Sequence, residues 1–250
     1  MADDIDDDSR HRAAPAGAIN AVIAAHLKSW FRKLRHGPRV DPDAFLHQVS
    51  GVVHVGANTG QERDLYQTLG LRVCWIEPIP DVFARLQQHI SGTANQRAFQ
   101  ALITDVDGRD YPFHVANNDG RSSSILDLKQ HRDIWPEVAF SSTVNLSSIT
   151  LASLFASERI DGSQYQALVM DTQGSELLVL KGAIALLKHF KYIKTEVPDF
   201  ESYAGCCQLA DISAFMTEHG YHELARNKFA GRAEGGSYFD IVYKRSEPPT

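Results

Sequence analysis

Short apolar runs alternate with helix-like patterns along most of the chain after residue 41. The runs are typical of buried strands, and the segments between them repeat apolar residues at the spacing of amphipathic helices. This order predicts an α/β fold with a mostly parallel sheet and helices on both of its faces. Strands are expected at Val52–Val55, Arg72–Ile76, Ala98–Ile103, Ala167–Met170 and Tyr192–Thr195. Helices are expected at Gln61–Leu69, Pro80–Ile90, Leu151–Ser157, Ser175–Lys188 and Leu209–His219.

The carboxyl-terminal part departs from this alternation. Tyr221–Ala225 and Tyr238–Lys244 are predicted strands joined by the glycine-rich segment Gly231–Gly236. Such a pair forms a hairpin, so the sheet is expected to end in antiparallel strands. Earlier in the chain, the segment Gly108–Ser148 lacks helical periodicity and is rich in Ser, Asn and Asp. There we expect a hairpin and a loop over the functional site.

Residues 1–40 differ from the rest of the chain. Residues 1–15 carry five aspartates, which predicts a disordered acidic tail. Residues 16–40 predict an amphipathic helix, with an apolar stripe from Ile19 to Leu34 and basic residues on the other face. We expect it to pack on the main domain, residues 41–250, or on the second subunit of a homodimer. The alternative is that the basic helix at residues 19–35 rests on an anionic membrane surface.

Composition narrows the class of protein. A chain of 250 residues can form one large α/β domain with an additional arm. The net charge of −6 argues against a general nucleic-acid-binding protein. The three cysteines show neither metal-binding nor disulfide spacing, which favours a cytoplasmic location. The sequence shows no apolar stretch long enough to span a bilayer, and its acidic start does not resemble a signal peptide.

A tight turn directly follows the first apolar run, and it is the most informative motif of the chain. It consists of Gly56, Ala57, Asn58, Thr59 and Gly60. Glycine allows such a turn and lets a ligand approach the backbone closely. The next apolar run ends in Glu77, 21 positions after Gly56. Because a carboxylate at that distance is placed to bind two ribose hydroxyls, we expect a cofactor that contains a nucleoside.

Three classes of such cofactor are considered. A phosphate-binding loop needs Gly-Lys-Ser/Thr, which Gly60-Gln61-Glu62 lacks. A dinucleotide site favours the spacing G-x-G-x-x-G, whereas the glycines here are spaced G-x-x-x-G, and Glu62 would repel a pyrophosphate. S-adenosylmethionine has no phosphate. It needs close backbone approach for its amino-acid part and a carboxylate for its ribose, so it fits these residues best.

Polar residues also follow the later strands, at Asp105, Asp171 and Glu196. Open α/β sheets bind ligands outside the carboxyl ends of their strands. We therefore expect these residues on one rim with the glycine turn and Glu77.

Six stretches at these strand ends carry a family resemblance. They are VVHVGANTGQE (Val52–Glu62), WIEPIPDVFARL (Trp75–Leu86), ALITDVDG (Ala101–Gly108), SSSIL (Ser122–Leu126), ALVMDTQGSELLVLKGA (Ala167–Ala183) and KTEV (Lys194–Val197). With them the chain resembles the FkbM-type family of S-adenosylmethionine-dependent methyltransferases, over residues 45–245. The resemblance implies a class I, Rossmann-like methyltransferase fold, whose seven-stranded sheet ends in an antiparallel hairpin. It also implies O-methylation, often of sugars or secondary metabolites, with S-adenosylhomocysteine as the product of the cofactor.

One residue departs from the family pattern. The family usually has Asp two residues before the first glycine of the turn, near the cofactor's amino group, and this chain has His54. Neutral histidine can accept a hydrogen bond from an ammonium group, whereas protonated histidine repels it. His54 is either tolerated beside a cofactor held by the backbone, or it has a catalytic or metal-binding role. The second hypothesis predicts that cofactor affinity falls below about pH 6.5.

Asp171 and Glu196 are the candidate catalytic residues. Methyl transfer to an alcohol requires the two reacting atoms to be aligned and a base to take the proton. The alternatives are that Asp171 caps the next helix and that Glu196 forms a salt bridge. A divalent cation would need a third oxygen ligand, and none is evident, so no metal ion is expected.

Other polar residues are weaker candidates. Asp105 is a candidate for the adenine amine of the cofactor, or it begins the turn Asp105–Gly108. Arg121 with the serines that follow it, Ser124 among them, is expected to hold an anionic substrate group or to close over the cofactor. His131 and Tyr203 are candidate substrate contacts.

The sequence therefore predicts an O-methyltransferase that acts on a small polar, sugar-like or secondary-metabolite acceptor. An N-methyltransferase is one alternative. Another is a noncatalytic S-adenosylmethionine-binding protein, in which His54 marks lost activity. A nicotinamide oxidoreductase is disfavoured because the dinucleotide glycine spacing is missing. The acceptor is expected to contact the loops Gly108–Ser148 and Asp199–Gln208, whose shape a sequence does not reveal.

Overall fold

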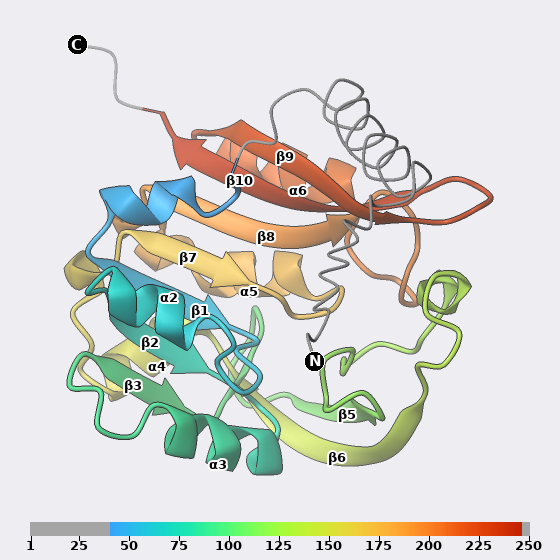
Figure 1. The fold of residues 1–250 in the computed structure, drawn as a ribbon, viewed down its shortest axis with the longest axis horizontal. Helices are drawn as coiled ribbons and strands as arrows, with labels where there is room; N and C mark the ends of the chain where they lie inside the picture. Colours follow the sequence, from blue (N-terminus) through green and yellow to red (C-terminus); the bar gives the residue numbers. More distant parts are fainter. Residues whose placement is uncertain (1–40, 247–250) are drawn as a thin grey trace, which may run out of the picture. The chain divides into compact units, whose positions relative to one another are not determined.

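The computed structural model describes residues 41–246, and a seven-stranded sheet lies at its centre (Figure 1). The strand order is β3-β2-β1-β7-β8-β10-β9. The first five strands in this order run parallel, and β10 runs antiparallel to both β8 and β9. The bounds are β1 (Gly51–Val55), β2 (Arg72–Ile76), β3 (Gln96–Phe99), β7 (Ala167–Met170), β8 (Tyr192–Pro198), β9 (Tyr221–Gly231) and β10 (Ser237–Arg245). The predicted α/β fold with a terminal antiparallel hairpin is confirmed.

Helices cover both faces of this sheet because alternate strand residues are apolar on both sides. One core joins β1, β2, β7 and β8 to α4 (Leu151–Ser157), α5 (Glu176–Gly182), α6 (Leu209–Glu218) and the 3₁₀ helix η4 (Ile184–His189). The opposite core joins the sheet to α2 (Arg63–Thr68), α3 (Pro80–His89) and the 3₁₀ helix η1 (Ala44–Gln48). In β1, Val53 and Val55 face the first core, whereas Val52 faces the second. His54 therefore points to the side of α2 and α3.

Two predicted elements are divided in the structure. The strand expected at Ala98–Ile103 is β3 followed by a separate strand β4 (Leu102–Ile103), which leaves the central sheet to pair with β6 (Phe140–Ile149). The helix expected at Ser175–Lys188 ends at Gly182, and η4 follows it. A Cβ on Gly182 would lie 2.1 Å from the carbonyl oxygen of Thr104. This close approach requires glycine, and glycine also weakens a helix.

The segment Gly108–Ser148 forms the expected hairpin. Strand β5 (Asp110–Ala116) pairs antiparallel with β6, and together with β4 they form a second, three-stranded sheet. The chain between β5 and β6 holds the short 3₁₀ helix η2 (Gln130–Asp133), and a further one, η3 (Gly162–Gln164), precedes β7. Gly120 and Arg121, in the connection between β5 and β6, reach the cavity described below.

Two expectations fall wholly outside the described residues. The acidic tail at residues 1–15 and the amphipathic helix at residues 16–40 lie there, so their packing and any membrane contact stay predictions. Between residues 41 and 246, no helix combines the length and the apolar character that crossing a membrane requires.

Candidate functional site

A cavity of about 430 Å³ opens at the carboxyl ends of β1, β2, β7 and β8. Its volume is within the usual range for small-molecule sites. Predicted site residues in its lining are His54, Gly56, Ala57, Asn58, Glu77, Arg121, Asp171 and Glu196. The expected rim is thus largely assembled from four strand ends. Four lining residues that the sequence analysis did not select as site residues are Glu62, Tyr66, Lys194 and Asp240.

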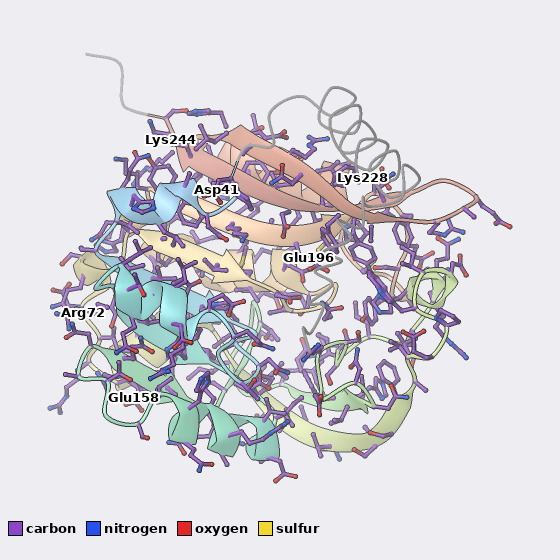
Figure 2. The ribbon with its side chains drawn as sticks, viewed as in Figure 1. Asp41, Arg72, Glu158, Glu196, Lys228 and Lys244 are labelled. Carbon is purple, nitrogen blue, oxygen red and sulfur yellow. The ribbon has the colours of Figure 1, made fainter. Side chains whose placement is uncertain are left out.

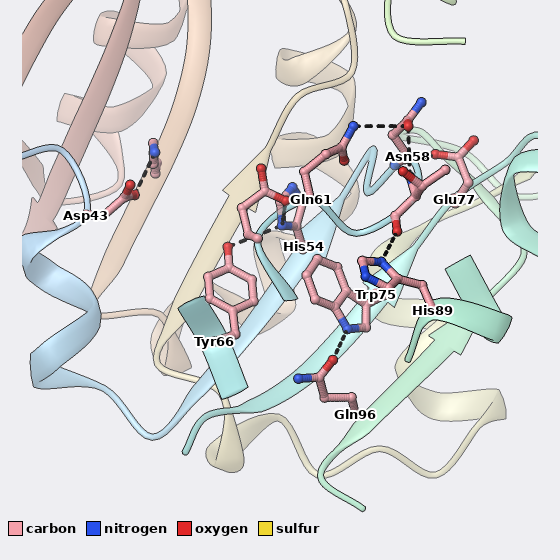
Figure 3. Close-up of polar contacts among 12 residues, drawn as sticks. Asp43, His54, Asn58, Gln61, Tyr66, Trp75, Glu77, His89 and Gln96 are labelled. Atoms are coloured by element: carbon pink, nitrogen blue, oxygen red, sulfur yellow. Dashed lines mark hydrogen bonds and ion pairs between the residues drawn. The ribbon is translucent and has the colours of Figure 1, made fainter. Parts of the chain in front are cut away.

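The glycine turn packs directly against the end of β7. Gly56 has a φ of +79°, and a Cβ there would lie 1.9 Å from the carbonyl oxygen of Asp171. The backbone N–H groups of Gly56 and Ala57 both donate to the carbonyl oxygen of Ile76, each at 3.0 Å. The turn therefore brings bare backbone to the cavity wall, which suits a closely bound ligand. Thr59 and Gly60 lie outside the lining, and the Thr59 carbonyl contacts His89 Nδ1 at 2.8 Å (Figure 3).

Glu77 is held by backbone N–H groups at the edge of the cavity. Its Oε2 accepts from the N–H of Asn58 at 2.8 Å, and its Oε1 accepts from the N–H of Ile79 at 2.9 Å. Burial raises the pKa of Glu77 to about 7, and these two hydrogen bonds oppose the rise. Each carboxylate oxygen keeps a second lone pair for a hydroxyl donor. The orientation fits the predicted binding of two ribose hydroxyls.

His54 is packed between aromatic rings. It is 4% exposed, its ring stacks on Trp75 with centroids 5.2 Å apart, and its Nδ1 lies 3.2 Å from the hydroxyl oxygen of Tyr66 (Figure 3). Burial lowers the pKa of His54, so the ring is neutral at pH 7. Among residues 41–246, no group of three or more His, Cys, Asp and Glu side chains is arranged to hold a metal ion. The geometry favours a packed, neutral histidine.

Asp171, which directly follows β7, and Glu196 of β8 both line this cavity. Figure 2 labels Glu196. Asp171 Oδ1 accepts a hydrogen bond from Gln173 Nε2 at 2.6 Å. Desolvation raises the pKa of both carboxyls, and the repulsion between them raises that of Glu196 further. A hydrogen bond from Gln173 lowers the pKa of each. Two carboxylates that titrate as a pair in a desolvated site are suited to acid–base chemistry.

The structure does not show the alternative roles considered for these two carboxylates, a helix cap for Asp171 and a salt bridge for Glu196. The residue that precedes α5 is Ser175, and the carboxylate that accepts from the local N–H groups of Thr172 and Gly174 is Glu176. Asp171 is therefore not the cap of this helix. Within the described part of the chain, Lys194 pairs with Asp43 at 2.7 Å, and Glu196 forms no ion pair.

Asp240 joins this acidic wall from the terminal hairpin. It lies opposite Glu196 in the register of β10 and β8, so both side chains leave the same face of the sheet. Burial raises the pKa of Asp240, and the charge of Lys194 opposes the rise. The sequence predicted a strand at Tyr238–Lys244, which contains Asp240, but the register of β10 with β8 depends on how the hairpin pairs.

The remaining predicted residues lie behind or outside the lining. Ser124 Oγ donates to the carbonyl oxygen of Gln173 at 2.8 Å, and the hydroxyl of Tyr203 lies 2.8 Å from Gln173 Oε1. His131 is buried, with Nδ1 2.8 Å from the hydroxyl of Tyr238, and burial lowers the pKa of His131 to about 4. These three residues support the wall, and the structure does not place them for direct ligand contact. Asp105 is exposed and outside the lining, so it is not placed to reach a ligand there.

Comparison with known proteins identifies similar sequences and folds. A family model described as "Methyltransferase FkbM domain" matches residues 54–223. The 2-O-methyltransferase NoeI of Sinorhizobium fredii is 27% identical over 169 residues, which cover 64% of this chain and 68% of that protein.

Two solved structures are among those that match this chain. An uncharacterized protein from Listeria monocytogenes serotype 4b is 10% identical with a TM-score of 0.49, covering 84% of this chain and 67% of its own. The 1,6-didemethyltoxoflavin-N1-methyltransferase of Burkholderia thailandensis is 12% identical with a TM-score of 0.43, covering 95% of this chain and 93% of its own.

Proposed function

The chain belongs to the FkbM methyltransferase family and is an S-adenosylmethionine-dependent methyltransferase, and from this premise we propose that it methylates a hydroxyl group. The acceptor is a small polar, sugar-like or secondary-metabolite molecule. The observation that carries the proposal is the pair Asp171 and Glu196, which share a desolvated cavity with the glycine turn and Glu77. The printed activity of the Sinorhizobium relative, a 2-O-methyltransferase, supports the same acceptor group.

The described residues fit the cofactor. Glu77 accepts hydrogen bonds from the ribose hydroxyls, because its two oxygens are already oriented by backbone N–H groups. Gly56 lets the turn pack against the carbonyl of Asp171, where a Cβ would lie 1.9 Å away, and this packing keeps the turn's backbone at the cavity wall, where the amino-acid part would bind. When bound, S-adenosylmethionine supplies a methyl group activated by its sulfonium.

In the proposed reaction, Asp171 is the general base. Its anion is stabilised by the hydrogen bond from Gln173, and it lies at the end of a central strand. The pKa of Glu196 is raised well above its usual range by desolvation and by the charge of Asp171, so Glu196 holds the proton of the pair. A protonated Glu196 donates a hydrogen bond that orients the acceptor oxygen, and Asp171 removes the hydroxyl proton as the methyl group is transferred.

Calorimetry and a methyl-transfer screen test this proposal. We expect S-adenosylhomocysteine to bind the wild type and to bind Glu77→Ala at least tenfold more weakly. With labelled S-adenosylmethionine, a panel of hydroxyl and amine acceptors is then compared by the position of the new methyl group. Asp171→Asn is expected to lower kcat by about 10²–10⁴-fold, the usual contribution of a general base.

The outcomes separate the alternatives. A methyl group found on nitrogen would make the protein an N-methyltransferase. Folded wild type that binds neither form of the cofactor would support the noncatalytic alternative.

A further inference from the structure

One carboxylate oxygen in the cavity wall lacks a hydrogen-bond donor. Glu62 lines the cavity next to the glycine turn, and its Oε2 is shielded from solvent without a partner among the described residues. The nearest titratable nitrogen, Nδ1 of His54, is 3.9 Å away, which is too far for a hydrogen bond. A buried carboxylate oxygen without a donor is unfavourable. We therefore expect a bound ligand to supply the hydrogen-bond donor that Glu62 Oε2 lacks.

The neighbouring side chains do not neutralise Glu62. His54 is uncharged, because burial lowers its pKa, and its Nδ1 already contacts the hydroxyl of Tyr66 at 3.2 Å. Lys194, which also lines the cavity, pairs with Asp43 at 2.7 Å. Arg63 directs its Nη1 to Asp64 at 2.7 Å. Lys194 and the Nη1 of Arg63 are therefore paired with other carboxylates, and the buried Nε of Arg63, like Glu62 Oε2, has no partner among the described residues.

A second carboxylate lies on the other side of the glycine turn. The charge of Glu62 contributes to the raised pKa of Asp171, so the two acids repel each other across the cavity. A positive group between them would remove this repulsion and supply the missing donor. The turn that carries Glu62 also supplies the N–H of Asn58, which orients Glu77 at the ribose position. A ligand that spans from Glu77 along the turn thus brings its other end to Glu62.

We infer that Glu62 binds the α-ammonium group of the methyl donor, and that His54 forms a neutral wall beside it. The inference rests on the proposed cofactor site and assigns the charge recognition within it. Glu62, the acidic residue assigned to the ammonium group, directly precedes α2 and is eight residues after His54 of β1.

Calorimetry with two nucleosides tests this assignment. S-adenosylhomocysteine carries the ammonium group, and 5′-methylthioadenosine shares its adenosine and thioether but lacks the amino-acid part. We expect Glu62→Gln to weaken S-adenosylhomocysteine binding at least tenfold and to change 5′-methylthioadenosine binding by less than twofold. Deaminated S-adenosylhomocysteine, which keeps the carboxylate, should bind wild type and variant alike. Glu158→Gln, a carboxylate outside the lining, is the matched control and should change neither affinity.

Each other result contradicts the inference. Equal losses for both nucleosides would show that Glu62 only shapes the turn. Unchanged affinity of Glu62→Gln for S-adenosylhomocysteine would show that the ammonium group lies elsewhere. If this variant lost affinity for the methyl acceptor alone, an acceptor hydroxyl would lie at Glu62. Failure of the proposed function is distinct from these results: without a cofactor site the wild type would bind neither nucleoside, and a methyl group on nitrogen would overturn the hydroxyl acceptor without affecting the assignment of Glu62.

Discussion

His54 and Glu77 line the same cavity, and burial moves their pKa values in opposite directions. Burial disfavours the charged form of each, so the histidine loses its proton more easily and the glutamic acid holds its proton more tightly. In the sequence analysis, one of two hypotheses for His54, a catalytic or metal-binding role, predicted that cofactor affinity falls below about pH 6.5. In the structure, burial raises the pKa of Glu77 to about 7, so its charge changes in that range, as does that of Asp171.

The pH dependence of cofactor affinity distinguishes these two residues. We expect S-adenosylhomocysteine to bind about tenfold more weakly at pH 6 than at pH 8, because one unit below its pKa only about a tenth of Glu77 is ionised. Isothermal titration of wild type, His54→Asn and Glu77→Gln between these pH values checks this. The dependence should persist in His54→Asn and disappear in Glu77→Gln. The reverse pattern would assign the titration to the histidine.

At the scale of elements, the site depends on how closely the turn after β1 packs on the end of β7. Gly56 joins these two elements, because its backbone lies where a side chain would overlap the carbonyl of Asp171. Gly174, at φ +101°, also brings the turn before α5 close to Cys206, with 2.8 Å between a Cβ there and the Cys206 Cβ. The Gly56 contact sets the spacing between the glycine turn and Asp171.

A pair of glycine substitutions measures this packing. Gly56→Ala and Gly70→Ala both place alanine at positive φ, +79° and +67°, but a Cβ at Gly70 meets nothing within 4 Å. We expect Gly70→Ala to cost about 1–2 kcal/mol from backbone strain alone. Gly56→Ala should cost at least about 2 kcal/mol more, because the backbone of β7 must move. Urea denaturation of both variants measures the difference in free energy of unfolding. Equal losses would mean that the backbone at the end of β7 moves without a cost in stability.

On the scale of the whole molecule, the cavity concentrates acids that oppose folding at neutral pH. Desolvation raises the pKa of Asp171, Glu196 and Asp240 in the lining, and of Glu176, which is buried beside the lining residue Thr172. A carboxyl whose pKa is higher in the folded state binds more protons there than when unfolded. Its contribution to stability is therefore lost as the pH rises from the unfolded value, about 4, through the folded value. Histidines with lowered pKa values act in the opposite direction.

Comparing one variant at two pH values isolates this effect from that of the histidines. We expect Glu196→Gln to be more stable than the wild type at pH 8, by about 1 kcal/mol or more, which corresponds to about 2–4 °C in Tm for a domain of this size. The gain should shrink at pH 5, where the wild-type carboxyl is protonated. Calorimetric Tm values check this, with Glu158→Gln as the control. A gain that does not depend on pH would mean that packing, not charge, is responsible.

Particular elements show how far the sequence predicts the fold. Apolar runs and helical spacing in the sequence predicted β2, β7 and α4 with the bounds that the structure has, because each is a short element with a uniform pattern. They merged β3 with β4 and α5 with η4, since the two halves of each pair share one apolar run. The breaks come from partners distant in sequence: β4 pairs with β6, and Gly182 approaches Thr104.

The sequence predicted those site residues whose chemical type and position next to an apolar strand both indicated a ligand site. The glycine turn, Glu77, Asp171 and Glu196 were found because each directly follows or ends an apolar strand, which a linear pattern reveals. The sequence placed the charge of Glu62 beside the glycine turn, whereas only tertiary structure brought Lys194 and Asp240 to the same cavity and placed His131 and Tyr203 behind its wall. Tertiary structure also decided the charge of His54 and Glu77. The physical reason is that local pattern specifies which face of a strand is buried, whereas register, burial and through-space charge depend on segments that meet only after folding.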